Sequence, residues 1–552
     1  MKRILQSHLA LQYLNYSIMK YIFICIFIYL SSLSYGQDMI VDWGECFGAN
    51  YSNSYGRAIE VLPNESIVTT IVVTDYNEAF TDYHGDADAW VLILDNTGNI
   101  VNDKCFGGGA EDVFQDIEVY DDYIYFIGYT QSTDGDVQSE PIGGYVDLWV
   151  VKTDFDLNII WERRYGCLGT QQFESAKVTE EGGLVLLMDF FGSGGGDVSQ
   201  YYGDTDIWVC KIDANGDILW EKTLGNTEGN YASNVLLTED NKTIIIGETN
   251  YSGGMVECNC HGMRDIWVIE LDNNTQEILW QGCYGGSEND AAVSILKDNS
   301  DYLIVGGTRS SDGDILSFNH GEGDAWVFQI DSGGQLVWER CFGGSGGEHI
   351  KKIYKTEDNG YFLFGVTSSE DGDVNNTNCP YPFCRTSAWV IELDSAKNML
   401  WNGTHGSYDY SYYKKNGIKR VGERDFIIAG IVGDQGTHLG DVDCDPYPIK
   451  NGYSAWIYRF YDPNVGLDNL FSSSLKTYPN PAINQVFIEL PEHSGNAEIK
   501  ILDIFGNSIT QLKAYNKQTQ ILWDCSNVTR GVYFYQTEIG DMVYRGKVLV
   551  NK

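Results

Sequence analysis

Apolar and polar positions along the chain recur with a long period. Each unit is marked by a small or aliphatic residue, then Trp, then Val or Ile, and the spacings between these motifs are 59, 59, 59, 59, 63 and 67 residues. Self-similarity at a fixed period of this length predicts a repeat architecture with seven units. The marking residues are Trp90, Trp149, Trp208, Trp267, Trp326, Trp389 and Trp456.

Each unit divides into four short apolar runs with turn signals between them. In the fifth unit the runs are residues 291–296, 301–308, 324–331 and 335–343, and the last two are joined through Asp-Ser-Gly-Gly, a hairpin signal. The runs are too apolar to leave one sheet face in water, so four-stranded blades should pack face to face around an axis. The predicted fold class is all-β: a seven-bladed β-propeller of four-stranded antiparallel blades, plus a small C-terminal β-sandwich.

The two ends of the repeat array should close on each other. A fourth-strand signal at Trp43 precedes the first complete unit, and none follows Trp456. We therefore expect the strand near residues 40–47 to complete the last blade beside residues 455–461. This pairing would remove an open sheet edge that invites aggregation.

The units resemble a bacterial seven-bladed β-propeller repeat family. The matching residues run from Asp206 to Gly216 with Trp220, and from Asp324 through Trp326 to the Cys-Phe-Gly-Gly-Ser segment that ends at Ser345. The resemblance covers about residues 38–462, although Ser387 and Ser454 replace the aspartate in the last two units. It implies a fold and no particular activity, since propellers host many functions.

A different pattern of short strands follows a linker at residues 463–477. It opens with Tyr478, Pro479, Asn480 and Pro481, continues through Ile501–Gly506 and through Gly531, Val532 and Tyr533, and ends on the segment from Lys547 to Lys552. These motifs resemble the type A C-terminal sorting domain of the type IX secretion system of Bacteroidota, an Ig-like β-sandwich, here residues 478–552. The resemblance implies contact with that secretion machinery, passage across the outer membrane, removal of the domain, and release or surface attachment.

The N-terminal residues 1–36 have the pattern of a secretory signal peptide. An apolar run from Tyr21 to Leu30 follows Lys20, and Gly36-Gln37 is the expected cleavage point. About ten apolar residues are too few to span a bilayer, so no integral membrane span is expected. Met19 is an alternative start to Met1. The localisation predicted from both ends is secreted or outer cell surface, by way of the periplasm.

The charge balance excludes some partners. The chain has 78 acidic and 36 basic residues and a formal net charge of −42. Such a field repels nucleic acid and anionic membranes, and it suits solubility or cation binding.

Acidic turns recur in the loops that should join the second and third strands of a blade. Oxygen ligands on a glycine turn suit calcium, although the spacing is not that of an EF-hand and the aspartates can instead bond their own turn. The calcium candidates are Asp134, Asp136, Asp312, Asp314, Asp371 and Asp373. No other cofactor is predicted.

Two further polar sets recur at fixed repeat positions. The aspartates before the marking Trp should anchor loops through backbone hydrogen bonds. His84, His261 and His320 each precede a Gly and are expected to serve turns, because they belong to different blades. His261 beside Cys258 and Cys260 resembles a zinc fragment without an evident fourth ligand. The aspartates are Asp88, Asp147, Asp206, Asp265 and Asp324.

The cysteines divide into two groups. Four of them occupy one repeat position, a full blade apart, and are expected to be packing residues: Cys46, Cys105, Cys283 and Cys341. Cys379 and Cys384 are the disulfide candidates, and the pairing of Cys258, Cys260 and Cys444 is left open.

No catalytic residue is predicted, because the chain has no nucleophile elbow, phosphate loop, dinucleotide fingerprint or zinc-protease helix. The favoured function is a binding or adhesion module at the cell surface that recognises a glycan or a protein through its long loops, where Tyr251, Tyr381 and Tyr447 are candidates to stack on sugars. The alternative is a polysaccharide-degrading enzyme with paired carboxylates at the channel mouth. A third possibility is a structural spacer with no ligand beyond calcium.

Overall fold

The computed structural model describes residues 40–47, 54–74, 80, 82–192, 194–374, 386–405, 411–433, 453–461, 475, 477–478, 482–491, 497–502, 508–539 and 542–551. The chain forms two compact units, Met1–Tyr461 and Asp462–Lys552. Each is described by itself.

The first unit contains seven four-stranded antiparallel sheets, the blades of a β-propeller. Blades 1 to 3 are β2 (Ser54–Val61), β3 (Ile67–Val73), β4 (Asp88–Leu94) and β5 (Ile100–Phe106); β6 (Asp112–Tyr120), β7 (Tyr123–Thr130), β8 (Asp147–Thr153) and β9 (Ile159–Tyr165); β10 (Thr170–Val178), β11 (Leu184–Phe191), β12 (Thr205–Ile212) and β13 (Ile218–Leu224). Blades 4 to 6 are β14 (Asn230–Leu237), β15 (Lys242–Thr249), β16 (Asp265–Asp272) and β17 (Ile278–Tyr284); β18 (Asp290–Asp298), β19 (Asp301–Thr308), β20 (Ala325–Ile330) and β21 (Leu336–Phe342); β22 (Glu348–Lys355), β23 (Tyr361–Thr367), β24 (Ser387–Leu393) and β25 (Met399–His405).

Blade 7 is built from both ends of the unit. It consists of β26 (Ser411–Gly422), β27 (Asp425–Gly433), β28 (Tyr453–Tyr461) and, as its outermost strand, β1 (Ile40–Phe47). β1 pairs antiparallel with β28, with Ile40 opposite Tyr461 and Cys46 opposite Trp456. The predicted fold class and the predicted closure by the N-terminal strand are therefore confirmed.

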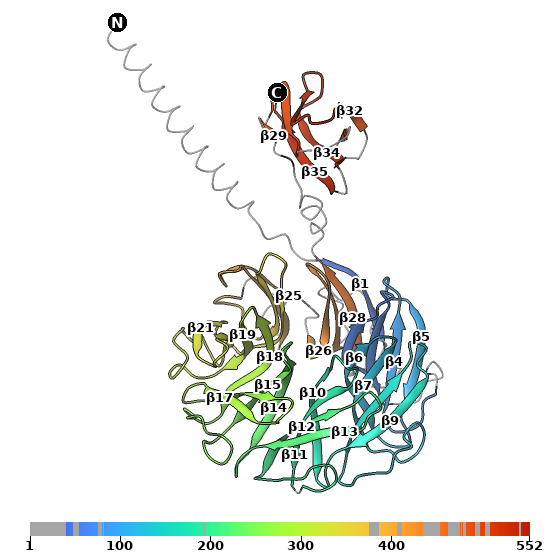
Figure 1. Cartoon of the computed structure of the whole chain (residues 1–552), viewed down its shortest axis with the longest axis vertical. Coiled ribbons are helices and arrows are strands. Elements are labelled where there is room, and N and C mark those ends of the chain that lie inside the picture. Colours follow the sequence, from blue (N-terminus) through green and yellow to red (C-terminus); the bar gives the residue numbers. More distant parts are fainter. Residues whose placement is uncertain are drawn as a thin grey trace, which may run out of the picture. The chain divides into compact units, whose positions relative to one another are not determined.

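The first strand of each blade lies toward the centre of the ring and the fourth lies outside. In Figure 1 the labels β6, β10, β14, β18 and β26 surround the centre, whereas β5, β9, β17 and β21 lie at the periphery. Third strands such as β8 are buried along their whole length, because both sheet faces pack on neighbouring blades. The apolar runs of the third strands in the sequence reflect this burial between neighbouring blades.

The marking tryptophans are held by a polar residue on the next strand. Trp149 Nε1 donates to Glu162 at 2.9 Å and Trp208 Nε1 to Glu221 at 2.8 Å, in each case the residue after the fourth-strand Trp. Blade 7 has Gly44 at that position, and Trp456 Nε1 is buried without a partner among the described residues. In blades 1 to 6 an acidic or amide side chain at this position of the fourth strand thus satisfies the buried indole.

Adjacent blades are fastened at the rim that carries the turns between third and fourth strands. Trp161 Nε1 of blade 2 donates to Ala214 O of blade 3 at 3.1 Å, and Tyr165 OH donates to Gly216 O at 2.7 Å. Trp43 Nε1 of blade 7 makes the same kind of bond to Asn96 O of blade 1 at 3.2 Å. The outer strand of one blade therefore grips the turn of the next.

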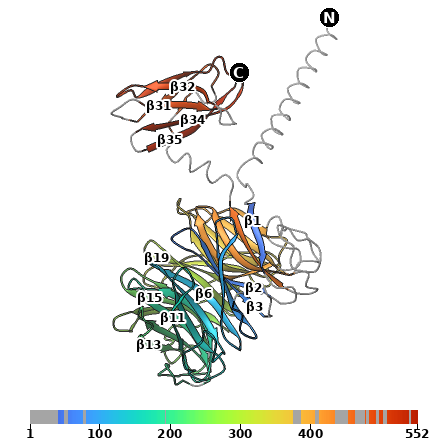
Figure 2. The same ribbon diagram turned by 90° about the vertical axis from the view of Figure 1, so that its right-hand side faces the viewer.

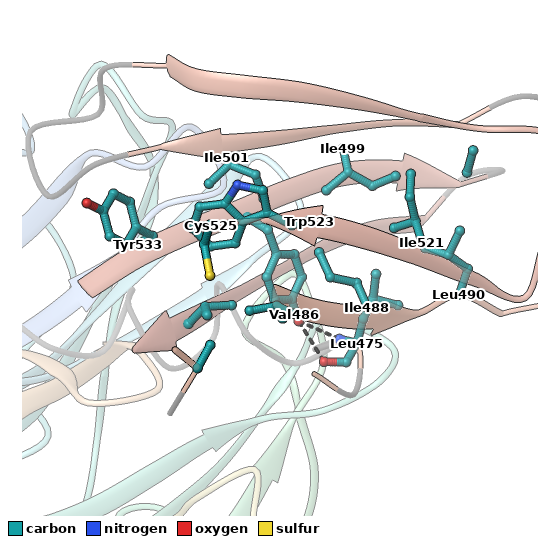
Figure 3. Packing of buried hydrophobic residues seen from close by; sticks show 14 of the residues in the cluster. Leu475, Val486, Ile488, Leu490, Ile499, Ile501, Ile521, Trp523, Cys525 and Tyr533 are labelled. Atoms are coloured by element: carbon teal, nitrogen blue, oxygen red, sulfur yellow. Dashed lines mark hydrogen bonds between the residues drawn. The ribbon is translucent and has the colours of Figure 1, made fainter. Parts of the chain in front are cut away.

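The second unit is a small β structure with its own core. Its strands are β29 (Thr477–Tyr478), β30 (Gln485–Glu489), β31 (Ala497–Leu502), β32 (Ser508–Ala514), β33 (Gln520–Asp524), β34 (Gly531–Ile539) and β35 (Met542–Val550). They form two sheets, in the orders β29-β30-β33 and β32-β31-β34-β35, and the second order is visible in Figure 2. Trp523, Ile501 and Val486 lie in the buried cluster that Figure 3 shows.

Two strands of this unit, the two-residue β29 and β32, were not among the short strands expected from the sequence. β32 has a mostly exposed or half-buried pattern that ends on the buried Ala514, so its sequence lacks the apolar alternation of its neighbours. It lies at the end of its sheet beside β31. An edge position needs less burial, which is why the sequence signal is weak.

Candidate functional site

The acidic turns lie where the second-to-third loops meet the linkers between blades. We name this region the long-loop rim: the loops at residues 131–146, 192–204, 250–264 and 309–324 of blades 2 to 5, with the linkers that precede each blade. The backbone N–H of Asp136 donates to Gly107 O at 2.8 Å, and the N–H of Asp314 donates to Gly285 O at 2.9 Å. Loop and linker are therefore joined directly, as the antiparallel topology predicts.

The first aspartate of each turn bonds the linker. Asp134 Oδ1 accepts the N–H of Gly109, Asp312 Oδ1 that of Ser287, and Asp371 Oδ1 that of Ser345, each at 2.7 Å. The Ser345 N–H lowers the pKa of the Asp371 carboxyl. Gly135, between the two aspartates of its turn, has φ 66°, and a Cβ there would lie 2.3 Å from Gly107 O, so this turn requires glycine.

The second aspartate of each turn lies over the same linker. Asp314 Oδ2 accepts the N–H of Gly285 at 3.1 Å and Asp373 Oδ2 that of Gly343 at 3.4 Å, whereas Asp136 lies 3.4 Å from Lys104 Nζ. Within the described ranges no group of three or more His, Cys, Asp or Glu side chains is arranged to hold a metal ion. The observed carboxylate bonds join each turn to the linker that precedes its blade.

Calcium binding by these turns stays a prediction, and thermal unfolding tests it. Because a bound ion stabilises the folded state by mass action, removal of calcium with a chelator should lower Tm by several degrees if the turns bind it. The measurement is calorimetry of the purified protein with and without chelator, with calcium added back as the control. An unchanged Tm would contradict calcium binding and leave the six aspartates with a structural role only.

A buried acidic latch recurs at the start of the inner strands, and the sequence reasoning missed it. Asp290 accepts the Thr308 hydroxyl, the Ser310 hydroxyl at 2.9 Å and the N–H of Gly286 at 2.7 Å. The same arrangement occurs at Asp112 and, with a longer side chain, at Glu348. The available signal was an acid four residues after the second Gly of the linker together with Thr-x-Ser at the end of the second strand.

The aspartates before the marking tryptophans anchor loops, as expected. Asp88 accepts the N–H of His84 at 2.7 Å, Asp206 that of Tyr202 at 2.7 Å, and Asp324 that of His320 at 3.1 Å. Asp147 and Asp265 accept equivalent bonds from Ile142 and His261. His84 and His320 also direct Nδ1 at their own aspartates, at 3.3 and 2.6 Å, so these histidines serve their own loops.

Two cysteines differ from the prediction. Cys283 forms a disulfide with Cys258, Cα to Cα 5.5 Å, and Cys46 is also disulfide-bonded. The prediction that these two are packing residues is wrong; for Cys283 the reason is that the long loop of its own blade folds against the outer strand. Cys105 and Cys341 are free and buried as predicted. Cys260 is free with Sγ 3.6 Å from Cys283 Sγ, and the disulfide removes Cys258 from the zinc fragment.

Several predicted residues lie outside the described residues: Gly36, Gln37, Cys379, Cys384, Pro479, Asn480, Pro481 and Lys552. Of the remaining sorting-motif residues, Tyr478 lies in β29, where its hydroxyl accepts a bond from Gln520 at 2.7 Å. Gly531, Val532 and Tyr533 lie in β34, and Lys547 lies in β35. Tyr533 is buried and donates to Thr529 O at 2.8 Å.

All seven inner strands bulge at the same position. In every blade the register of the first strand against the second shifts there, and the residues skipped at this shift form a ring around the channel, here called the bulge ring. Blade 7 skips four residues, Lys414 to Gly417, where the others skip one. The single members are Arg57, Gln115, Glu174, Ser233, Val293 and Lys351.

The long bulge of blade 7 reaches across to other blades. Lys415 Nζ donates to Ser233 O of blade 4 and lies 3.6 Å from Glu174 of blade 3. Asn416 Nδ2 donates to Gln115 O of blade 2 at 3.1 Å. A bulged residue leaves the ladder, so its carbonyl needs another donor, and these side chains supply it.

A cavity of about 140 Å³ lies on the bulge ring, and we name it the channel-mouth cavity. Beyond the bulge ring itself, Gln172 and Phe173 contribute to its lining, and both precede the bulge of β10. Inner strands begin at the linkers, so the cavity lies on the side of the long-loop rim. Its lining residues are Arg57, Gln115, Gln172, Phe173, Glu174, Lys414, Lys415 and Asn416.

Large apolar and aromatic side chains are exposed around the long-loop rim of blades 2 to 5. Tyr145 is 73% exposed, Tyr251 58% and Phe318 75%. Tyr201 and Tyr202 of blade 3 are also exposed, as are Leu168, Met263 and Leu316. Of the predicted stacking residues, Tyr381 and Tyr447 lie outside the described part of the chain. We name Tyr145, Tyr201, Tyr202, Tyr251 and Phe318 the aromatic collar.

The second unit matches a known protein family. Residues 476–551 match the family model of the secretion system C-terminal sorting domain. The protein is therefore an exported β-propeller that the type IX secretion machinery handles, secreted or at the cell surface. No helix among the described residues is long and apolar enough to cross a membrane.

Solved structures with similar folds share little sequence with the chain. A Synechocystis apocarotenoid oxygenase mutant has 10% identity and a TM-score of 0.34, over 88% of this chain and 96% of that one. A europium-containing methanol dehydrogenase has 10% identity and a TM-score of 0.33, over 77% and 93%. A Bacteroides caccae protein of unknown function has 10% identity and a TM-score of 0.31, over 64% and 94%. No curated protein sequence matches the chain. The propeller assignment accordingly rests on sheet topology.

Proposed function

We propose that the protein is a binding module of the cell surface or its surroundings, with the long-loop rim as its ligand surface. The observation that carries this proposal is the aromatic collar. Exposed aromatic rings cost free energy in water. Several of them on one rim are typical of a surface that contacts a ligand or a partner. Loops on a rigid ring are also the usual place for binding residues.

A glycan is the ligand that fits the collar best. Tyrosine and phenylalanine present flat apolar faces, and the tyrosine hydroxyl adds a polar tip for hydrogen bonding. Because the rim also carries the acidic turns of blades 2 and 5, a hydroxyl-rich ligand would find carboxylate acceptors on the same rim. The module would be delivered by the sorting domain and would act after export.

The alternative, a polysaccharide-degrading enzyme, calls for paired carboxylates at the channel mouth. The lining of the channel-mouth cavity includes one carboxylate, Glu174, and it lies 3.6 Å from Lys415. A lining with one carboxylate among the described residues does not favour the hydrolase.

A glycan array with the purified protein and two variants tests the proposal. Stacking on one ring is worth roughly 0.5–1.5 kcal/mol, so Tyr251→Ala and Phe318→Ala should each weaken glycan binding about two- to tenfold. Tyr515→Ala is the matched control, since Tyr515 is 65% exposed but belongs to the second unit. Absence of binding to any glycan would contradict the proposal and favour a structural spacer.

A further inference from the structure

The channel-mouth cavity carries a surplus of positive charge inside a strongly acidic protein. Arg57, Lys414 and Lys415 line it against the single carboxylate of Glu174. Lys351, the bulge residue of blade 6, lies close enough to Lys414 and Lys415 to be affected by their charge. The whole chain has a net charge of −42, so this concentration of cations is local.

Farther along the inner strands, after the bulge ring, two lysines are paired with carboxylates. Lys177 is ion-paired with Glu118, and Lys419 lies 2.5 Å from Glu60. Burial and the neighbouring Lys177 lower the pKa of Lys352 to about 8, and Asp116 opposes this shift. Two of these three lysines are thus ion-paired with carboxylates, whereas the cations that line the cavity outnumber its one carboxylate.

Polar atoms of the cavity lack partners. Arg57 Nε and Gln115 Oε1 are buried without a hydrogen-bond partner among the residues that the structure describes. Because amide oxygen and nitrogen are interchangeable by a flip, Gln115 can present a donor at the same place. Buried unpaired donors beside a cavity are satisfied when a ligand supplies acceptors.

The cations at the cavity also repel one another, which disfavours their protonated forms. Burial, together with Lys414 and Lys415, lowers the pKa of Lys351 to about 8, and burial together with Arg57 lowers the pKa of Lys414. The cavity of about 140 Å³ has room for a few water molecules or one small anionic group. An anion there would relieve the repulsion and satisfy the buried donors together.

We propose that the channel-mouth cavity binds one oxyanion group, a carboxylate or a sulfate, of an acidic ligand, with Arg57 and Lys414 as its cationic partners and Gln115 as a further donor. This proposal rests on the long-loop rim being the ligand surface and names the class of ligand. The acidic surface of the protein repels long polyanions. The ligand is therefore a small acidic sugar, or a largely neutral chain that ends in one acidic unit.

Calorimetric titration of the purified protein with galacturonate, and with galactose as its neutral counterpart, tests the proposal at constant ionic strength. Galacturonate should bind at least tenfold more tightly than galactose. Arg57→Gln and Lys414→Gln should each cost about tenfold in galacturonate affinity, because each removes one charge-assisted contact. Lys222→Gln, on the outer strand β13, is the matched control and should leave the affinity unchanged.

Thermal unfolding without ligand separates binding from folding. Since Lys414→Gln relieves repulsion, its Tm should equal or exceed that of the unmodified protein, whereas a folding defect would lower it. Displacement of galacturonate by inorganic sulfate would identify the oxyanion group as the feature recognised. Binding that sulfate does not displace, yet that Arg57→Gln weakens, would identify a sugar acid held also by its ring.

Equal affinity for galactose and galacturonate, or no effect of Arg57→Gln and Lys414→Gln, would overturn the proposal. If Tyr251→Ala then still weakened glycan binding, the long-loop rim would stand as the ligand surface and only the anion site would fall. If neither set of variants changed binding of any glycan, the proposed function would fail as well.

Discussion

Deleting Ile40–Phe47 is expected to abolish cooperative folding of the propeller unit. Without β1, the strand β28 loses its partner from Ala455 to Tyr461, and the side chains of Phe47 and Trp43 no longer cover the core cluster between blades 7 and 1. An open, apolar edge of this length is a template for aggregation. Circular dichroism on heating and size-exclusion chromatography should show loss of the sharp transition and soluble aggregates.

Two further variants make this result specific. Deleting residues 462–552 removes a separate compact unit and should leave the transition of the propeller unchanged. Because Ile40 lies opposite Tyr461, moving Ile40–Phe47 behind Tyr461 through a short hairpin turn should restore folding. A deletion variant that melts like the intact protein would show that β1 does not close the ring.

Replacing the buried latch in blade 5 is the second change with a large expected effect. Asp290→Ala leaves the hydroxyls of Thr308 and Ser310 and the N–H of Gly286 without their acceptor. Each buried donor left unpaired costs about 1–3 kcal/mol, so we expect a loss of roughly 3–5 kcal/mol in the free energy of unfolding. Chemical denaturation, with a lower midpoint at unchanged slope, measures it.

The repeat itself provides the controls for the latch. Blade 4 has Asn230 at this position, and Asn226 in place of the linker glycine accepts its amide. Asp290→Asn should therefore be intermediate, since Gly286 offers the amide no acceptor side chain. Asp204→Ala, at an exposed position of the β11–β12 loop, should change stability by about 0.5 kcal/mol or less. Similar losses for Asp290→Ala and Asp204→Ala would contradict a structural role of the latch.

Much of the fold could be predicted because its signals are local and repeated seven times. The number of blades follows from the period of the marking tryptophans and from the hairpin turns. The closure of the ring follows from the fourth-strand signal at Trp43, which precedes the first complete unit. The acidic turns were also visible, but the sequence did not show that their carboxylates bond the linker before the blade. β32 was missed because an edge strand needs little apolar patterning.

The disulfide between Cys258 and Cys283 could not be read from repeat positions. Cysteines at the same repeat position of successive blades lie a full blade apart and do not meet. The contact forms within blade 4, where the loop before β16 folds back against β17. Loop geometry, which varies from blade to blade, decides such pairs.

The sequence by itself determined the seven-bladed ring, its closing strand and the C-terminal sorting domain, because each depends on spacing or on contiguous motifs. Only the tertiary structure decided which side chains meet at the channel mouth. Arg57, Gln115, Glu174 and Lys351 occupy equivalent positions in their blades. They include cations, an amide and a carboxylate, so no recurrent residue type marks the position in the sequence. They converge because a backbone bulge turns one residue of each inner strand out of its ladder, and because closure of the ring brings the four-residue bulge of blade 7 against blades 2, 3 and 4.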